Sequence, residues 1–176
     1  MVARARRFIA TGAPGSGKST VLAMLMDAVE VIPEAATDVN ENMLAEGISR
    51  PELDDMFLPR IVLLQRRRRL AADGMLQVHD RSVYCTVALA RFLGRGEPAE
   101  LHEELEMCRR WFEPMVFFFE PFGSIKATPV RRITYADAVR FGAVHREVYE
   151  EHGVDLVTVR AEPPRQRAAL IATLIS

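Results

Sequence analysis

The amino-acid sequence predicts a single α/β domain in which helices cover both faces of a five-stranded, mainly parallel sheet. Short apolar runs alternate with longer helical patterns along the chain, which is typical of βαβ units. The apolar runs are nearly continuous, as expected for strands buried on both faces. The length of 176 residues is that of one domain, and 49% hydrophobic residues supply enough apolar material for a packed core. We therefore expect one domain over residues 1–176.

The five strands are expected at the short apolar runs. The run that begins at residue 7 has the basic flank of a signal peptide, but Gly12 and Pro14 interrupt it after a few residues, so a strand fits better. Residues 115–119 form the clearest run, because all five are apolar. In chain order, the predicted strands are 7–11, 31–33, 75–80, 115–119 and 155–159.

Helical periodicity marks the segments between the strands. After the first strand, Val21, Leu22 and Leu25 recur at the spacing that places them on one helix face. Pro51 is acceptable at a helix start, and Gly74 lies just past the end of the longest helical pattern. The predicted helices are 19–29, 38–46, 51–72, 83–93, 98–112 and 134–152, with a last helix after Pro163-Pro164.

Charge and cysteine content exclude several classes of function. Twenty-three Lys and Arg against 24 Asp and Glu leave a net charge of −1, so no overall field attracts nucleic acid or anionic lipid. No apolar run approaches the ~20 residues that cross a bilayer. Cys85 and Cys108 are too few for a disulfide framework, and neither they nor the histidines have metal-ligand spacing. We expect a cytoplasmic protein without a membrane or nucleic-acid partner, and we leave open whether it forms a homo-oligomer.

The strongest motif lies between the first strand and the first helix, where the chain fits G-x-x-x-x-G-K-[ST] completely. Its glycines let the backbone turn around an anion, and the helix N-terminus directs N–H groups and a positive dipole end at it. Lys18 is expected to neutralise the β- and γ-phosphates of ATP, and Ser19 to ligate Mg²⁺. The motif predicts a P-loop NTPase three-layer α/β/α sandwich with ATP and Mg²⁺ as cofactors. The expected ATP-binding residues are Gly12, Ala13, Pro14, Gly15, Ser16, Gly17, Lys18, Ser19 and Thr20.

Two carboxylates compete for the acid that supports the Mg²⁺ shell. Asp80 ends the third predicted strand, where P-loop proteins place that acid, although the strand before it is less apolar than usual. Glu120 follows the cleaner apolar run at 115–119. We favour Asp80, because Arg81 and Ser82 follow it directly and a strong helical pattern comes next. Glu120 remains the alternative.

Three segments resemble a known family. The P-loop, residues 34–38 (EAATD) and residues 80–85 (DRSVYC) look like the predicted AAA-type P-loop ATPases related to ribosylnicotinamide and deoxynucleoside kinases. The resemblance implies a nucleoside- or nucleotide-kinase-like fold and an ATP-dependent kinase. It also implies that Glu34 is the base toward the substrate hydroxyl and that Arg81 belongs to a catalytic acid-Arg-Ser triplet. This chain has Asp where those kinases have Glu in the triplet.

The position of Glu34 leads to the same role without the resemblance. Ligands bind outside the carboxyl ends of parallel strands, so a carboxylate just after the second strand is expected to face the P-loop rim. With the second strand near the first, Glu34 would accept a hydroxyl proton as the acceptor attacks the γ-phosphate. Asp38 would share this role or hold substrate hydroxyls, or it would cap a helix. Both residues have an alternative interpretation as ordinary surface carboxylates.

The basic run 66–69 does not predict a nucleic-acid surface, because four consecutive helical arginines point in four directions. Gln65 and Arg68 continue the apolar face of Leu58 and Ile61 and are candidates for substrate contact, as the related kinases hold a base with a Gln on the comparable helix. A solvated basic turn is the alternative interpretation of this run.

A lid is expected at about residues 120–133, between the fourth strand and the long helix. Arg131 and Arg132 at its end would supply forked donors to the transferring phosphoryl group, and a closed lid would exclude water. A plain basic loop is the alternative interpretation.

Taken with the P-loop, these residues favour a kinase that transfers the γ-phosphate of ATP to a hydroxyl of a small, nucleoside-like or other small-molecule acceptor. A P-loop ATPase or nucleotide-dependent switch that acts on a protein partner remains the alternative, because Glu120 is available as a hydrolytic acid and the sequence contains no acceptor signature.

Overall fold

The computed structural model describes residues 4–122 and 134–176. Its centre is one five-stranded sheet in which all the neighbouring strands run parallel, as predicted. The strand order is β2-β3-β1-β4-β5. The strands are β1 (Arg6–Gly12), β2 (Glu30–Ile32), β3 (Leu76–Asp80), β4 (Met115–Phe119) and β5 (Asp155–Val159).

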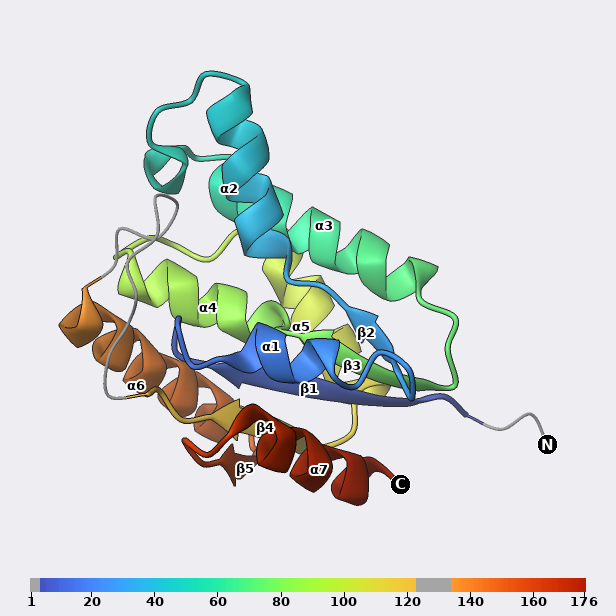
Figure 1. Cartoon of the computed structure of the whole chain (residues 1–176). Coiled ribbons are helices and arrows are strands. Elements are labelled where there is room, and N and C mark those ends of the chain that lie inside the picture. Colours follow the sequence, from blue (N-terminus) through green and yellow to red (C-terminus); the bar gives the residue numbers. More distant parts are fainter. Residues whose placement is uncertain (1–3, 123–133) are drawn as a thin grey trace.

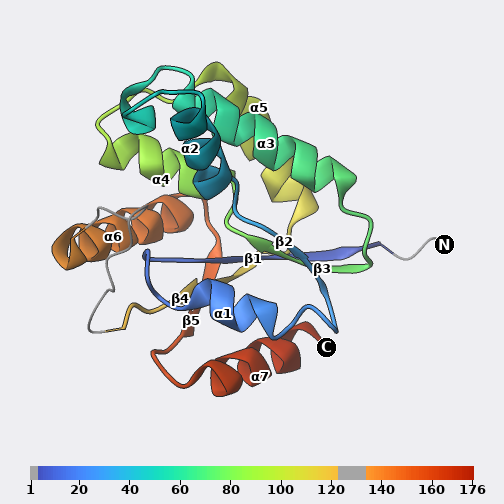
Figure 2. The same ribbon diagram turned by 45° about the horizontal axis from the view of Figure 1, so that its top comes forward.

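Helices lie on both faces of the sheet and complete a three-layer α/β/α sandwich (Figure 1, Figure 2). One face carries α1 and α7, which also pack against each other. The other face carries α3, α4, α5 and α6, and α2 packs on the outside of α3. The helices are α1 (Lys18–Ala23), α2 (Ala35–Ala45), α3 (Phe57–Ala71), α4 (Val83–Phe92), α5 (Ala99–Trp111), α6 (Tyr135–Glu151) and α7 (Pro164–Ile175), with a short 3₁₀ turn η1 (Pro51–Leu53).

The core forms because successive residues of a strand point to opposite faces of the sheet. Phe8 and Ala10 of β1 face α1 and α7, whereas Ile9 between them faces α4, α5 and α6. All three are at most 1% exposed. Both faces of the central strand are therefore buried, which explains why its sequence is a continuous apolar run.

Three predicted helix boundaries are wrong, each for a local reason. The helix predicted at 19–29 ends at Ala23, because the chain then turns through i→i−3 bonds such as Leu25 N to Leu22 O (3.0 Å). The helix predicted at 51–72 is interrupted at Asp54, whose carboxylate accepts a hydrogen bond from the Met56 N–H (2.8 Å) and competes with helical bonding. The helix predicted at 38–46 begins three residues earlier, directly after Glu34.

The expected nearness of β2 to β1 is also wrong, because β3 lies between them. β2 pairs with β3 through Glu30–Gln77, Val31–Val78 and Ile32–His79. Glu34 therefore approaches the P-loop across the carboxyl end of β3. No helix among residues 4–122 and 134–176 is long and apolar enough to span a membrane.

Candidate active site

The P-loop has a backbone that only glycine accommodates at its critical points. Gly12, Gly15 and Gly17 have φ values of 144°, 79° and 75°, which side-chain-bearing residues rarely adopt. A Cβ atom at Gly12 would lie 2.5 Å from the Phe119 carbonyl oxygen of β4. The loop then enters α1 at Lys18, and residues 13–20 line a hollow of about 120 Å³. This is the geometry of an anion cradle at a helix N-terminus.

Lys18, which lines this hollow, forms a buried ion pair with Asp80. Their side chains are 6% and 8% exposed. Asp80 ends β3 as predicted, and the pairing of Ala10 with Asp80 brings it beside the strand that leads into the P-loop. Glu120, the alternative acid, follows β4, and its Oε2 accepts a hydrogen bond from the Ala161 N–H at 3.3 Å.

Arg81 is the one non-glycine residue with positive φ (72°) in the described part of the chain. Such a backbone is uncommon and is often found at functional sites. The Arg81 Nε lies 2.6 Å from Glu34 Oε1, and its Nη1 donates to His145 Nε2 at 2.9 Å. Burial alone would lower the pKa of Arg81, but Glu34, Cys85 and Asp80 outweigh it and raise the pKa. Arg81 is therefore a permanent cation that links β3, α2 and α6.

Glu34 occupies the N-cap position of α2. Besides the ion pair with Arg81, its Oε2 accepts a hydrogen bond from Thr37 Oγ1 at 3.2 Å. Arg68 donates to the Pro33 carbonyl (3.1 Å) and to the Glu34 carbonyl, and it forms an ion pair with Asp38. Asp38 and Arg68 thus join α2 to α3, and their predicted contact with substrate stays a prediction.

A cleft of about 620 Å³ adjoins the P-loop hollow. Pro14, Glu34 and Arg81 line both, so the two spaces meet at these three residues. Gln65 also lines the cleft, where its amide donates to the Ser82 carbonyl (3.1 Å) and accepts from Thr86 Oγ1 (3.0 Å). A molecule in the cleft would therefore lie next to an anion held by the P-loop, with Glu34 and Arg81 between them.

Sequence reasoning missed a buried polar network beneath the cleft. The Cys85 Sγ lies 3.1 Å from Thr11 Oγ1 and 3.2 Å from the Tyr149 hydroxyl, which lies 2.9 Å from Ser82 Oγ. Burial alone would raise the pKa of Cys85, but His145, Arg81 and the hydrogen bond to Thr11 lower it to about 6. If the Cys85 thiol is ionised at neutral pH, the thiolate adds a negative charge beneath Arg81. No spacing in the sequence indicates that these residues meet.

Arg167 of α7 is a second residue that the sequence did not single out. It is 1% exposed and donates to the carbonyls of Ser16 (2.6 Å), Glu120 (3.2 Å) and Val159 (3.1 Å). Its guanidinium also lies over the Phe119 ring. The C-terminal helix thereby holds the P-loop backbone from a position 151 residues away.

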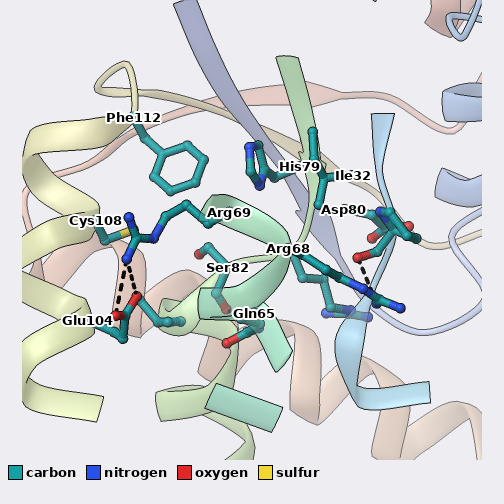
Figure 3. A pocket seen from close by; sticks show the side chains of 13 residues that line it. Ile32, Gln65, Arg68, Arg69, His79, Asp80, Ser82, Glu104, Cys108 and Phe112 are labelled. Carbon is teal, nitrogen blue, oxygen red and sulfur yellow. Dashed lines mark hydrogen bonds and ion pairs between the residues drawn. The ribbon is translucent and has the colours of Figure 1, made fainter. Parts of the chain in front are cut away.

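A smaller pocket lies behind Asp80, between β3, α3 and α5 (Figure 3). Arg69 and Glu104 form an ion pair on one side of it, with N–O distances of 3.0 and 3.1 Å. Arg69 is 6% exposed, so a solvated basic turn does not describe this end of the run 66–69. Arg68 and Arg69 instead contact different helices, in agreement with the predicted divergence of the four arginines.

His79 projects into this pocket beside Phe112 and is 5% exposed. Burial, together with Arg7 and Arg69, lowers its pKa to about 3. His79 therefore stays neutral in the folded protein at mildly acidic pH.

The free energy of unfolding should depend on pH through His79. In the unfolded chain this imidazole binds a proton near pH 6.5, so the free energy of unfolding should fall as pH drops below that value, by at most about 1.4 kcal/mol per pH unit. From pH 7 to pH 5, the free energy of unfolding of the wild type should fall by about 2 kcal/mol more than that of His79→Gln. Urea unfolding of both proteins in Mg²⁺-free buffer measures the free energy of unfolding at each pH. If it changes equally with pH in both proteins, His79 is not a buried neutral imidazole.

Arg131 and Arg132, and most of the predicted lid at 120–133, lie outside the described residues. The predicted contact of the two arginines with the transferring phosphoryl group therefore stays a prediction.

The fold and the glycine-rich loop define a protein of the P-loop NTPase class. Within that class the chain belongs to an AAA domain family, whose model matches residues 7–167. The structure is similar to that of a thymidylate kinase from Candida albicans, with a TM-score of 0.60, 13% identity and coverage of 99% of this chain and 92% of that chain. A thymidylate kinase from Ehrlichia chaffeensis gives a TM-score of 0.64 and 12% identity, over 98% of this chain and 100% of that one. No curated protein matches the sequence.

These comparisons establish the family and the fold. The structural likeness supports the predicted kinase-like form of the sandwich, because both thymidylate kinases cover nearly the whole chain. The narrower relation to ribosylnicotinamide and deoxynucleoside kinases stays a prediction.

Proposed function

We propose that this protein is a kinase that transfers the γ-phosphate of ATP to a hydroxyl group of a small acceptor. The observation that carries the proposal is that Glu34 and Arg81 line both the P-loop hollow and the cleft. Phosphoryl transfer needs donor and acceptor in line, with charged groups at the junction. The thymidylate-kinase-like fold supports the same reaction class.

The P-loop supplies the donor side of the reaction. Its backbone N–H groups and Lys18 would hold the triphosphate, with Lys18 exchanging its pair with Asp80 for the β- and γ-phosphates. Ser19, exposed at the start of α1, and Asp80 are oxygen donors of the kind that Mg²⁺ prefers, so these residues fit a nucleotide-bound Mg²⁺. That ion would neutralise charge on the β- and γ-phosphates.

The junction residues would carry out the proton transfer. Glu34 accepts the proton of the acceptor hydroxyl as the hydroxyl oxygen attacks the γ-phosphorus. The bond between that phosphorus and the β–γ bridging oxygen breaks, and ADP leaves. Arg81 fixes the Glu34 carboxylate through the 2.6 Å ion pair and presents its cation to the charge on the transferred group. Gln65, held by Ser82 and Thr86, borders the acceptor. The chemistry needs no covalent enzyme intermediate.

An acceptor screen tests the proposal. ATP consumption is followed with nucleosides, nucleotides, sugars, amino sugars and amino alcohols, and with no acceptor as the baseline. A kinase should consume ATP slowly alone and much faster with its acceptor. Consumption that no acceptor increases would overturn the proposal in favour of the ATPase or switch.

Asp80→Asn should raise the Mg²⁺ concentration needed for half-maximal rate by about 10- to 100-fold, as for loss of a residue that orients the metal shell. Glu120→Gln is the matched control, because Glu120 follows β4, which β1 separates from β3, and its carboxylate accepts a hydrogen bond from the Ala161 N–H. Magnesium titration of the initial rate measures both. If Glu120→Gln shifts the titration and Asp80→Asn does not, the two acids must be exchanged in the mechanism.

A further inference from the structure

The cleft beside the P-loop is lined by more negative than positive charge. Three carboxylates, Glu34, Glu41 and Glu52, line it among the described residues, against one arginine, Arg81. Arg81 is already engaged by Glu34 at 2.6 Å. Glu52 pairs with Arg50, which does not line the cleft, and both are solvent-accessible. Glu41 is exposed and makes no ion pair with a described residue. Counting residues 4–122 and 134–176, the cleft therefore retains uncompensated negative charge away from the P-loop.

Helix geometry sets the distance between this charge and the reacting end of the cleft. Glu34, Thr37 and Glu41 follow one another at spacings of three and four residues along α2, so they lie along one helix face. All three line the cleft. Seven residues of helix separate Glu34 from Glu41, which corresponds to about 10 Å at 1.5 Å per residue. This is the length of a nucleoside-sized molecule.

Apolar side chains form much of the wall between the two ends. Phe57 and Ile61 of α3, Leu89 of α4 and Phe141 of α6 line it. Such a wall favours a ring or another apolar body. Rings also attract a cation placed over their faces. The cleft thus has a reacting end at Glu34, an apolar middle and an acidic outer end at Glu41 and Glu52.

We propose that the acceptor carries a positively charged group about 10 Å from the hydroxyl that is phosphorylated, and no phosphate group of its own. This inference rests on the proposed kinase function and narrows its substrate class. An acceptor phosphate would meet Glu41 and Glu52, whereas a cation there is attracted by both carboxylates. The thymidylate kinases of the same fold, by their name, act on a nucleotide, so the proposed acceptor differs from theirs in charge.

The test compares acceptors that differ mainly in charge. One set is 1-methyladenosine, a cation at neutral pH, its uncharged isomer N6-methyladenosine, and adenosine monophosphate. A second set is 7-amino-1-heptanol, 1-heptanol and 7-hydroxyheptyl phosphate, in which an extended chain separates the charged group from the hydroxyl. For at least one set, kcat/KM should be highest for the cation and lowest for the phosphate. A preference for the uncharged or the phosphorylated member in the sets that support turnover would overturn the inference and leave the kinase proposal intact.

A charge variant links any preference to the outer end of the cleft. Glu41→Gln should raise KM for the cationic acceptor about two- to fivefold, the effect of losing one exposed ion pair, with kcat and the KM of the uncharged isomer nearly unchanged. Asp27→Asn is the matched control, because Asp27 is an exposed carboxylate that lines neither the cleft nor the P-loop hollow. Equal loss for charged and uncharged acceptors would contradict a charge-specific role of Glu41. ATP consumption that no acceptor of either set or of the wider screen increases would overturn the kinase proposal, and this inference with it.

Discussion

Replacing Lys18 with alanine should reduce phosphoryl transfer by about three orders of magnitude or more and weaken Mg-ATP binding. Lys18 is the cation of the P-loop; it lines the hollow and is only 5% exposed. A preorganised cation at developing phosphoryl charge acts in a water-poor site, where losing even one such donor costs about 10²–10³ in rate. In the proposed kinase, Lys18 would also contribute to ground-state binding of the β- and γ-phosphates, so both parameters should change.

Calorimetric titration with a non-hydrolysable ATP analogue and measurement of turnover give the two parameters. Arg165→Ala is the control, because Arg165 is exposed on α7 and lines neither the P-loop hollow nor the cleft. It should match the wild type in both assays. Unchanged analogue affinity together with unchanged turnover in Lys18→Ala would contradict the assignment of residues 12–20 as the ATP site.

The Lys18 variant also has a structural consequence that must be measured separately. Removing the lysine leaves Asp80 buried without its partner, and breaking a buried ion pair from one side typically costs about 3–5 kcal/mol. We therefore expect a lower free energy of unfolding, and turnover should be compared at a temperature where both proteins are folded. The double variant Lys18→Met/Asp80→Leu, which removes both charges, should recover stability without recovering turnover.

The parts of the site that the sequence predicted are those encoded by local backbone requirements. Gly12 is needed because a Cβ there would collide with the Phe119 carbonyl oxygen. Gly15 and Gly17 are needed because their φ angles are positive. The spacing of the three glycines in the sequence therefore indicates the conformation of the loop. The apolar runs predicted the strands because parallel strands are buried on both faces. Asp80 was correctly placed at the end of β3, although that strand is less apolar, because Arg81, Ser82 and a strong helical pattern follow it.

The remaining parts depend on which surfaces meet, and residue periodicity does not contain that information. His145 and Arg81 lie 64 residues apart, and their hydrogen bond exists because α6 packs against α4. Arg167 reaches the P-loop only because α7 packs beside α1. The strand order is of the same kind, since nothing in residues 30–32 indicates pairing with β3 instead of β1. Arg81 itself was identified, but its left-handed backbone was not, because no glycine marks the turn.

The replacement of Glu34 with glutamine should separate binding from chemistry. The amide keeps the shape of the carboxylate and remains able to accept a hydrogen bond from Thr37, but it does not accept the acceptor's proton. Loss of a positioned general base typically lowers turnover by about 10²–10⁴. Because Glu34 belongs to the start of α2 and not to the loop 12–20 that would hold the phosphates, ATP-analogue affinity should stay within a few-fold of the wild type.

Two comparisons make the Glu34 result interpretable. Glu46→Gln removes a carboxylate at the other end of α2, where it pairs with Arg60, and should leave turnover unchanged. Glu34→Asp keeps a base but shortens it by one methylene, so it should recover part of the activity that Glu34→Gln loses, whereas a purely structural role for the Arg81 ion pair predicts similar losses for both. Wild-type turnover in Glu34→Gln with a saturating acceptor would remove Glu34 as the base. Proton transfer would then have to proceed through another residue of the cleft, and Cys85, with its lowered pKa beneath Arg81, would be the next to replace.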